Sequence, residues 1–134
     1  MDEAIKEIVR QRAGGCCEYC RLPQDAYDLT FHIEHVVATQ HLQDDSLSNL
    51  ALACDRCNLH KGTNLSTIDP DTKERVEVFH PRVDRWSDHF MLVGPDIVGL
   101  SAKGRGTVRL LKMNAERRLL LRARLIDEGR FRTD

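Results

Sequence analysis

The sequence has no long hydrophobic run and no sign of a secretory leader. No apolar stretch approaches the roughly 18 residues that a membrane-spanning helix needs, and the first residues, MDEAIK, lack the basic-then-apolar order of a signal peptide. Internal repeats, low-complexity tracts and an evident linker are also missing. With 134 residues, 41% hydrophobic and 31% charged, the chain is expected to be a cytoplasmic protein that folds as a single domain over residues 1–134.

A basic excess is missing as well. The formal net charge is −1, which argues against a nucleic-acid partner, because such proteins usually carry surplus Lys and Arg to replace the counterions of phosphate. The net charge, however, combines two regions of opposite charge. Residues 1–99 hold 10 basic and 17 acidic residues, whereas residues 100–134 hold 10 basic and 4 acidic ones. The C-terminal extension, about residues 103–134, is therefore basic enough to meet a polyanion.

Helix and strand signals alternate in the first half of the chain. Apolar residues at helical spacing, stopped by two glycines, predict a helix over residues 2–13. A segment rich in β-branched and aromatic residues predicts a strand over 29–37. After a polar loop, Asp55 is expected to cap a short helix that runs to Gly62.

The second half also mixes both kinds of element. Residues 75–79 predict another strand, and a Gly-Pro turn predicts a hairpin that joins strands at 90–93 and 97–100. From Thr107 the apolar pattern becomes helical, and Asn114 is expected to cap the second of two helices. The sequence therefore predicts the α+β class, with hairpin strands and C-terminal helices.

Four of the five cysteines form two tight pairs, Cys17-x-x-Cys20 and Cys54-x-x-Cys57, which are separated by 33 residues. In a reducing compartment, pairs with this spacing are metal ligands more often than disulfides. We predict one tetrahedral zinc with four sulfur ligands. Such a site has no open coordination position, so this zinc should hold the fold and take no part in catalysis. Cys16 can replace Cys17 in the first pair, but the spacing is then less regular.

Between and after the cysteine pairs lies a second pattern. His32-Ile33-Glu34-His35 is followed by Asn49, which precedes an apolar segment, and by Asn58, which directly follows the last cysteine. This arrangement resembles the HNH endonucleases that enclose their active site with a cysteine-bound zinc. The resemblance covers residues 17–62 closely, and the downstream region is similar to that of small stand-alone members. It implies a ββα-metal (His-Me) finger stapled by the zinc site, and the hydrolysis of phosphodiester bonds in DNA.

The resemblance also implies roles for individual residues. His35 would be the general base that takes a proton from the attacking water, and Asn49 would hydrogen-bond across the finger to hold the histidine loop. Glu34 and Asn58 would hold a catalytic divalent ion. Asn58 replaces the final histidine of the motif, and an amide oxygen suits hard Mg²⁺ better than a soft transition metal.

Elementary chemistry agrees with these roles but leaves one point open. Phosphodiester hydrolysis needs a nucleophile made from water and neutralisation of the charge at phosphorus, and an imidazole with a pKa near ~6.5 can accept the proton. On a regular strand, however, Glu34 and His35 face opposite sides, whereas His32 and Glu34 share one. We expect the strand to bend near Glu34, with His32 as the alternative metal partner.

Several other polar residues are candidates for contact with the substrate. His41 lies in a polar loop and is either a ligand for metal or phosphate or a solvated side chain. The arginines Arg117, Arg118, Arg122 and Arg124 are expected to form a solvated helix face. The cluster of His80, Trp86 and His89 either touches DNA or covers the core. The candidate DNA contacts are Lys61, Arg82 and Arg85.

Two classes of function follow from this sequence. The first is a metal-dependent DNA endonuclease with a structural Zn²⁺ and a catalytic Mg²⁺ or other divalent ion. The second is a zinc-stapled module that binds nucleic acid and does not cut it. A redox or metal sensor that uses Cys16 and its neighbours is a third interpretation. The coincidence of Glu34-His35, Asn49 and Asn58 favours the endonuclease, since a binding finger has no need of them.

Overall fold

The structure, a computed structural model, describes residues 1–133. It is mixed in helix and strand, as expected, and its strands form three separate antiparallel pairs, β1–β2, β3–β4 and β5–β6. The elements in chain order are α1 (Glu3–Arg12), β1 (His32–His35), β2 (Leu50–Ala53), α2 (Asp55–Lys61), β3 (Ser66–Ile68), β4 (Arg75–Glu77), α3 (Trp86–His89), β5 (Phe90–Val93), β6 (Asp96–Gly99), α4 (Ala102–Leu110) and α5 (Glu116–Asp127).

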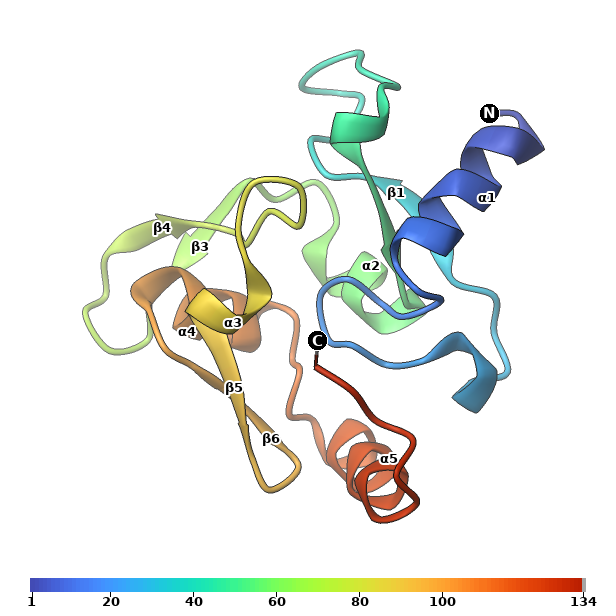
Figure 1. The fold of residues 1–134 in the computed structure, drawn as a ribbon. Coiled ribbons are helices and arrows are strands. Elements are labelled where there is room, and N and C mark those ends of the chain that lie inside the picture. Colours follow the sequence, from blue (N-terminus) through green and yellow to red (C-terminus); the bar gives the residue numbers. More distant parts are fainter. Residues whose placement is uncertain (134) are drawn as a thin grey trace.

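The first part of the chain places a hairpin-like strand pair beside a short helix (Figure 1). β1 and β2 run antiparallel in unbroken register from His32↔Ala53 to His35↔Leu50, and α2 follows β2 after a single residue and contacts β1. β2 is buried along its whole length, since α1 packs against it as well. The result is a strand–strand–helix unit around which the candidate site residues are distributed.

The second part of the chain packs α4 against the β5–β6 pair and the β3–β4 pair. The contact between α4 and the end of α3 is very close, because a Cβ added at Gly104 would lie 2.1 Å from the carbonyl oxygen of His89. Only glycine fits there. The hairpin predicted at 90–93 and 97–100 is confirmed within one residue, with Gly94 in the left-handed region at φ 57°.

Three expectations about helix ends are wrong. α2 is capped by Cys54, whose sulfur accepts a hydrogen bond from the backbone N–H of Cys57, and Asp55 is already the first helical residue. α5 begins after Ala115 without a side-chain cap. Asn114 instead bonds both backbone groups of Ile97 in β6, at 2.9 and 2.8 Å. α4 starts at Ala102, earlier than Thr107, because Ser101 caps it through a hydrogen bond to the N–H of Gly104.

One connected apolar cluster joins the two parts. It includes Val9 of α1, Tyr19, Trp86 and Met113, together with the four paired cysteines. Trp86 donates its indole N–H to the carbonyl oxygen of Tyr19 at 2.8 Å, so the buried polar group of the ring is satisfied. Among the described residues, no helix is long and apolar enough to cross a membrane.

Candidate metal centre and catalytic residues

The first cysteine pair lies in a tight knuckle. The N–H of Arg21 bonds the carbonyl oxygen of Cys17 at 2.9 Å, and the N–H of Cys20 points at the sulfur of Cys17 at 3.5 Å. Arg21 closes the turn in the left-handed region, with φ 69°. The second pair is placed by α2, where the N–H of Cys57 points at the sulfur of Cys54 at 3.4 Å. In both pairs, the backbone N–H of the second cysteine thus points at the sulfur of the first.

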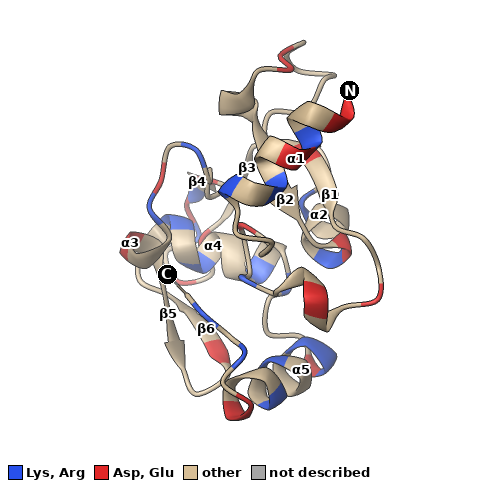
Figure 2. Cartoon of the chain, turned by 45° about the vertical axis from the view of Figure 1, so that its right-hand side comes forward, with Lys and Arg blue, Asp and Glu red and all other residues tan. Residues whose placement is uncertain are grey.

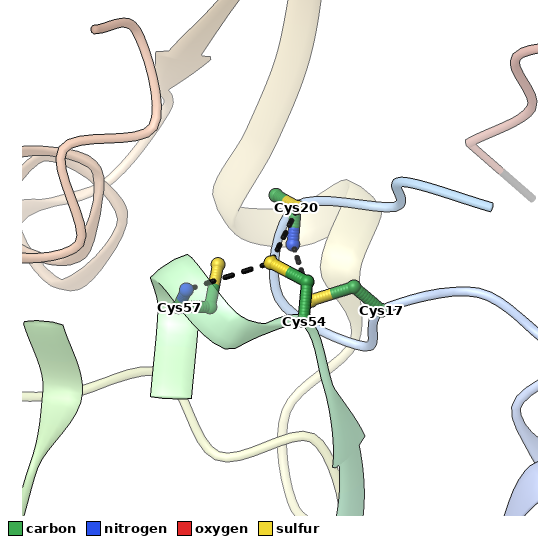
Figure 3. A group of neighbouring side chains, drawn as sticks. All are labelled: Cys17, Cys20, Cys54 and Cys57. Atoms are coloured by element: carbon green, nitrogen blue, oxygen red, sulfur yellow. Dashed lines mark hydrogen bonds between the residues drawn. The ribbon is translucent and has the colours of Figure 1, made fainter. Parts of the chain in front are cut away.

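The four sulfurs of Cys17, Cys20, Cys54 and Cys57 meet in one buried cluster (Figure 3). All lie within 4.8 Å of one another, and the sulfurs of Cys20 and Cys54 are 3.7 Å apart. A tetrahedral zinc with Zn–S bonds of about 2.3 Å requires sulfurs roughly 3.8 Å apart. The geometry therefore fits the predicted four-cysteine site. Cys16 lies outside the cluster and bonds the carbonyl oxygen of Gly14 instead.

The electrostatics of the cluster also call for a cation. Burial raises the pKa of the Cys17 and Cys57 thiols well above the usual range, and the neighbouring sulfurs raise the pKa of Cys17 further. Four thiolates cannot occupy this buried space together unless a positive charge compensates them. A zinc ion supplies that compensation, and would tie the knuckle to α2.

The knuckle also pairs with the outer edge of β2. The N–H of Glu18 bonds the carbonyl oxygen of Leu52 at 2.8 Å, and the Glu18 carboxylate accepts the N–H of Leu52 at 2.8 Å. The other carboxylate oxygen of Glu18 accepts from Arg82. Because Glu18 is fixed in this way, the next residue, Tyr19, is held under the strand pair.

Glu34 of β1 points into the interior. Its residue is 7% exposed, one carboxylate oxygen accepts a hydrogen bond from the Tyr19 hydroxyl, and the other lies 3.8 Å from the ammonium nitrogen of Lys61 on α2. Burial raises the pKa of Glu34, although Lys61 and Tyr19 oppose that rise. The structure thus places this carboxylate against α2, as a ligand shared with Asn58 would require, but with both oxygens already engaged.

His35 lies on the opposite face of β1. The strand continues through His35 in regular register, so the bend expected near Glu34 is not present and the two side chains diverge. The side chain of His35 is 22% exposed, and its Nε2 atom lies 2.7 Å from a carboxylate oxygen of Asp45. His32 shares the strand face of Glu34 but is exposed.

Asn49 ties down the loop between the two strands. Its side-chain oxygen accepts the N–H of Val37 at 2.9 Å, and its side-chain nitrogen donates to the carbonyl oxygens of Val37 and Asp44, at 3.1 and 2.9 Å. These bonds span the loop that follows His35 and that carries Asp45. Asn49 is therefore placed to keep both side chains in position.

Asn58 lies in the middle of α2 and is half-buried. Lys61, three residues later on the same helical face, reaches the carbonyl oxygen of Val36 at 2.7 Å. The Asn58 side chain itself makes no hydrogen bond to any described residue. The structure thus brings Glu34 and α2 together, but among the described residues no hydrogen bond or ion pair joins Asn58 to Glu34 or either of them to His35.

The segment that holds this geometry, with both cysteine pairs, β1, β2 and α2, matches a known family model. Residues 17–64 match the model of the HNH endonuclease family. Over a longer range, the chain is similar to the Septu protein PtuB of Bacillus thuringiensis, with 28% identity over 124 residues. The match covers 91% of this chain and 46% of that protein, so the chain spans about half the length of this curated relative. No solved structure matches the chain significantly.

Two of the three candidate DNA contacts near the HNH segment are engaged inside the protein. Lys61 is 1% exposed, and Arg82 pairs with Glu18, while burial lowers the pKa of its guanidinium to about 10. These positions do not suit the direct phosphate contacts expected from the sequence. Arg85 is exposed, so its contact with DNA stays a prediction.

The downstream histidine and tryptophan cluster covers the core of the HNH segment. Trp86 is buried, and the ring of His89 packs edge-on against Phe79 and lies 2.7 Å from the Ser101 hydroxyl. His80 accepts the N–H of Arg82 at 3.1 Å. Of the two alternatives left open by the sequence, the structure favours packing over contact with DNA.

Sequence reasoning missed Tyr19 and Asp45, which hydrogen-bond to the candidate site residues Glu34 and His35. Tyr19 lies inside the knuckle, where its spacing from Glu34 follows no motif, and Asp45 lies in a polar loop with other acidic residues. His41, in the same loop, bonds the carbonyl oxygen of Thr63 at 3.1 Å, which links the loop to the chain just beyond α2. Only the fold shows these pairings.

Proposed function

We propose that the protein is a metal-dependent endonuclease that hydrolyses phosphodiester bonds in DNA. The observation that carries the proposal is the HNH match over residues 17–64, a range that contains Glu34-His35, Asn49 and Asn58, the residues to which the sequence resemblance assigns roles. The order β1, β2, α2 and the four-cysteine cluster are what a zinc-stapled ββα-metal finger requires.

In this proposal His35 is the general base. Asp45 fixes the imidazole by accepting a hydrogen bond from Nε2 at 2.7 Å, and the proton on Nε2 leaves a lone pair on Nδ1. Nδ1 is then the atom that accepts the proton of the attacking water. Asn49 holds the loop between the strands and so keeps His35 and Asp45 in register.

Glu34 and Asn58 are the proposed ligands of the catalytic ion. Both offer oxygen atoms, which hard divalent cations prefer, and two protein ligands leave several positions for water and phosphate. When bound, the ion would neutralise charge on the scissile phosphate and on the departing oxygen. Glu34 must first exchange its contact with Lys61 for the ion, because that ammonium group now balances the carboxylate.

The engagement of Glu34 also supports the second candidate function, a zinc-stapled module that binds nucleic acid without cutting it. In that case the Glu34–Lys61–Tyr19 cluster is only a buried polar network. The separation of Glu34 and His35 on opposite strand faces is consistent with the same alternative. The two functions differ in whether a divalent metal produces cleavage.

A plasmid assay separates these alternatives. The zinc-loaded chain is stripped of loosely bound metal with a mild chelator and incubated with supercoiled plasmid, with and without added Mg²⁺ or Mn²⁺. The endonuclease proposal expects nicked plasmid only after metal is returned, with zinc content unchanged. Retarded migration of the DNA without nicking in either metal would support the binding module and overturn the endonuclease.

A further inference from the structure

Beyond the HNH segment, one arginine of the C-terminal helix reaches the cysteine cluster. Arg118 of α5 donates from Nη2 to the sulfur of Cys57 at 3.0 Å and lies 3.9 Å from the sulfur of Cys54. Its other terminal nitrogen donates to the carbonyl oxygen of Leu111 at 2.6 Å. The guanidinium fork therefore spans the metal cluster and the chain segment that leads into α5.

No carboxylate balances this guanidinium among residues 1–133. The partners of Arg118 are sulfurs and backbone carbonyl oxygens only. A half-buried cation needs a nearby negative charge, and the cysteines are its source. A zinc ion with four thiolates carries a net charge of about −2, whereas four neutral thiols carry none.

A second arginine, one helical turn later, belongs to the same arrangement. Arg122 is buried and donates to the carbonyl oxygens of Met113 and Pro95, at 2.6 and 2.8 Å. Arg118 and Arg122 thus form the inner face of α5, while Arg117 and Arg124 are exposed. The expectation that all four arginines form a solvated face is wrong for the inner two.

These side chains also line a cavity beside the sulfurs. A cavity of about 270 Å³ lies between α5 and the cysteine pairs, and its walls include Cys20, Cys54, Arg118 and Arg122. α5 makes few contacts with the other helices and strands, since no element pair that includes it is among the larger contacts of the fold. The two inward arginines and the buried Leu125 are therefore important for the attachment of this helix.

We propose that Arg118 is an outer hydrogen-bond partner of the zinc thiolates, so that zinc retention and the docking of α5 stabilise each other. Zinc creates the negative charge that holds the guanidinium, and the guanidinium lowers the cost of burying that charge. Groups that hydrogen-bond to metal ligands commonly change metal affinity 10- to 100-fold when removed. The coupling does not depend on nuclease activity.

The experiment measures zinc release from the full, zinc-loaded chain with a chromophoric chelator. Arg118→Gln is compared with Arg124→Gln, which removes the same charge from an exposed position on α5 that does not line the cavity. We expect Arg118→Gln to release zinc about tenfold faster than wild type, and Arg124→Gln to match wild type. Equal release rates for Arg118→Gln and wild type, or equal acceleration by both variants, would overturn the proposal.

Hydrogen exchange provides the reciprocal readout on the same zinc-loaded samples. In Arg118→Gln, the amides of α5 should exchange faster while those of α4 keep wild-type protection, which also shows that the variant is folded. Faster exchange in α5 with unchanged zinc release would mean that Arg118 serves packing alone, against the proposal. If Arg118→Gln does not fold, the same comparison is made with Arg118→Lys and Arg124→Lys, because lysine cannot reproduce the two-pronged hydrogen bonding of the guanidinium group.

Discussion

Asp45 gives His35 the one hydrogen bond that its imidazole makes to a described residue. The 2.7 Å approach of Nε2 to the carboxylate selects the tautomer in which Nδ1 can accept a proton. The side chain of Asp45 is largely exposed, so it adds little to the stability of the fold. Its value to the protein lies in the orientation of His35.

At this scale we predict that Asp45→Asn lowers plasmid cleavage about tenfold or more, since the proposed base loses its preferred tautomer and orientation. Zinc content and melting temperature should stay at wild-type values. Asp28→Asn, which removes another exposed carboxylate, is the matched control. The comparison is made by initial nicking rates at several pH values, and an unchanged rate profile for Asp45→Asn would remove Asp45 from the site.

The sequence predicts which residues belong to the candidate sites more readily than it predicts which residues they contact. The spacing of the cysteine pairs predicts the sulfur cluster, because two tight turns have few other ways to satisfy four buried thiols. The partners of Glu34 are not predictable in this way. Tyr19 and Lys61 come from the knuckle and from α2, and only the packing of these elements brings them to β1. The bend expected at Glu34 fails because β2 pairs with β1 through His35.

Among the elements, the turn between β3 and β4 is joined to α4 by a buried ion pair. Asp69 is fully buried and accepts two bonds from Arg105, at 3.0 and 2.8 Å. Its carboxylate also accepts the N–H of Asp71 and the hydroxyl of Thr72, both at 3.0 Å. These hydrogen bonds hold the pKa of Asp69 well below its usual range, and those from Arg105 have the largest effect.

The contribution of the Asp69 carboxylate to the stability of the fold depends on pH, because folding lowers the pKa of Asp69. A carboxyl whose pKa is depressed by folding stabilises the native state above its unfolded pKa, about 3.9, and loses that contribution as the pH falls below it. We therefore predict that Asp69→Asn has a lower melting temperature than wild type at pH 7, and that the difference narrows as the pH falls from about 4 towards 2. Thermal denaturation followed by circular dichroism measures both.

Asp71→Asn is the control for that series. Asp71 lies 3.1 Å from the same guanidinium but is exposed, and exposed pairs contribute little. Its melting temperature should stay close to that of wild type at every pH. A difference between Asp69→Asn and wild type that does not change with pH would contradict the ion-pair account of this junction.

Prediction at the element scale succeeds where the local pattern and the packing agree. The helix over 2–13 and the hairpin at 90–99 have clear periodicity and turn signals, and the structure has both. α4 is predicted too late because Gly104 and Gly106 disguise its first turns, although close packing requires glycine there. The β3 strand carries no signal of its own and forms because it pairs with β4.

In the molecule as a whole, the cysteine cluster is the junction of three regions. The knuckle brings Tyr19 to β1, α2 brings Lys61 to the same strand, and α5 reaches the cluster through Arg118. Figure 2 shows that basic residues of α5 lie on more than one side of the helix. The basic extension predicted from the sequence therefore divides into an inner face that meets the metal cluster and an outer face, with Arg117 and Arg124, that stays exposed.

The most direct test of the account is plasmid nicking by zinc-loaded His35→Ala in the presence of Mg²⁺, with zinc content and melting temperature measured on the same sample. The account predicts that the variant keeps its zinc and its fold but loses nicking by roughly 100-fold or more, the usual contribution of a general base. Nicking at the wild-type rate by this folded, zinc-loaded variant would contradict it.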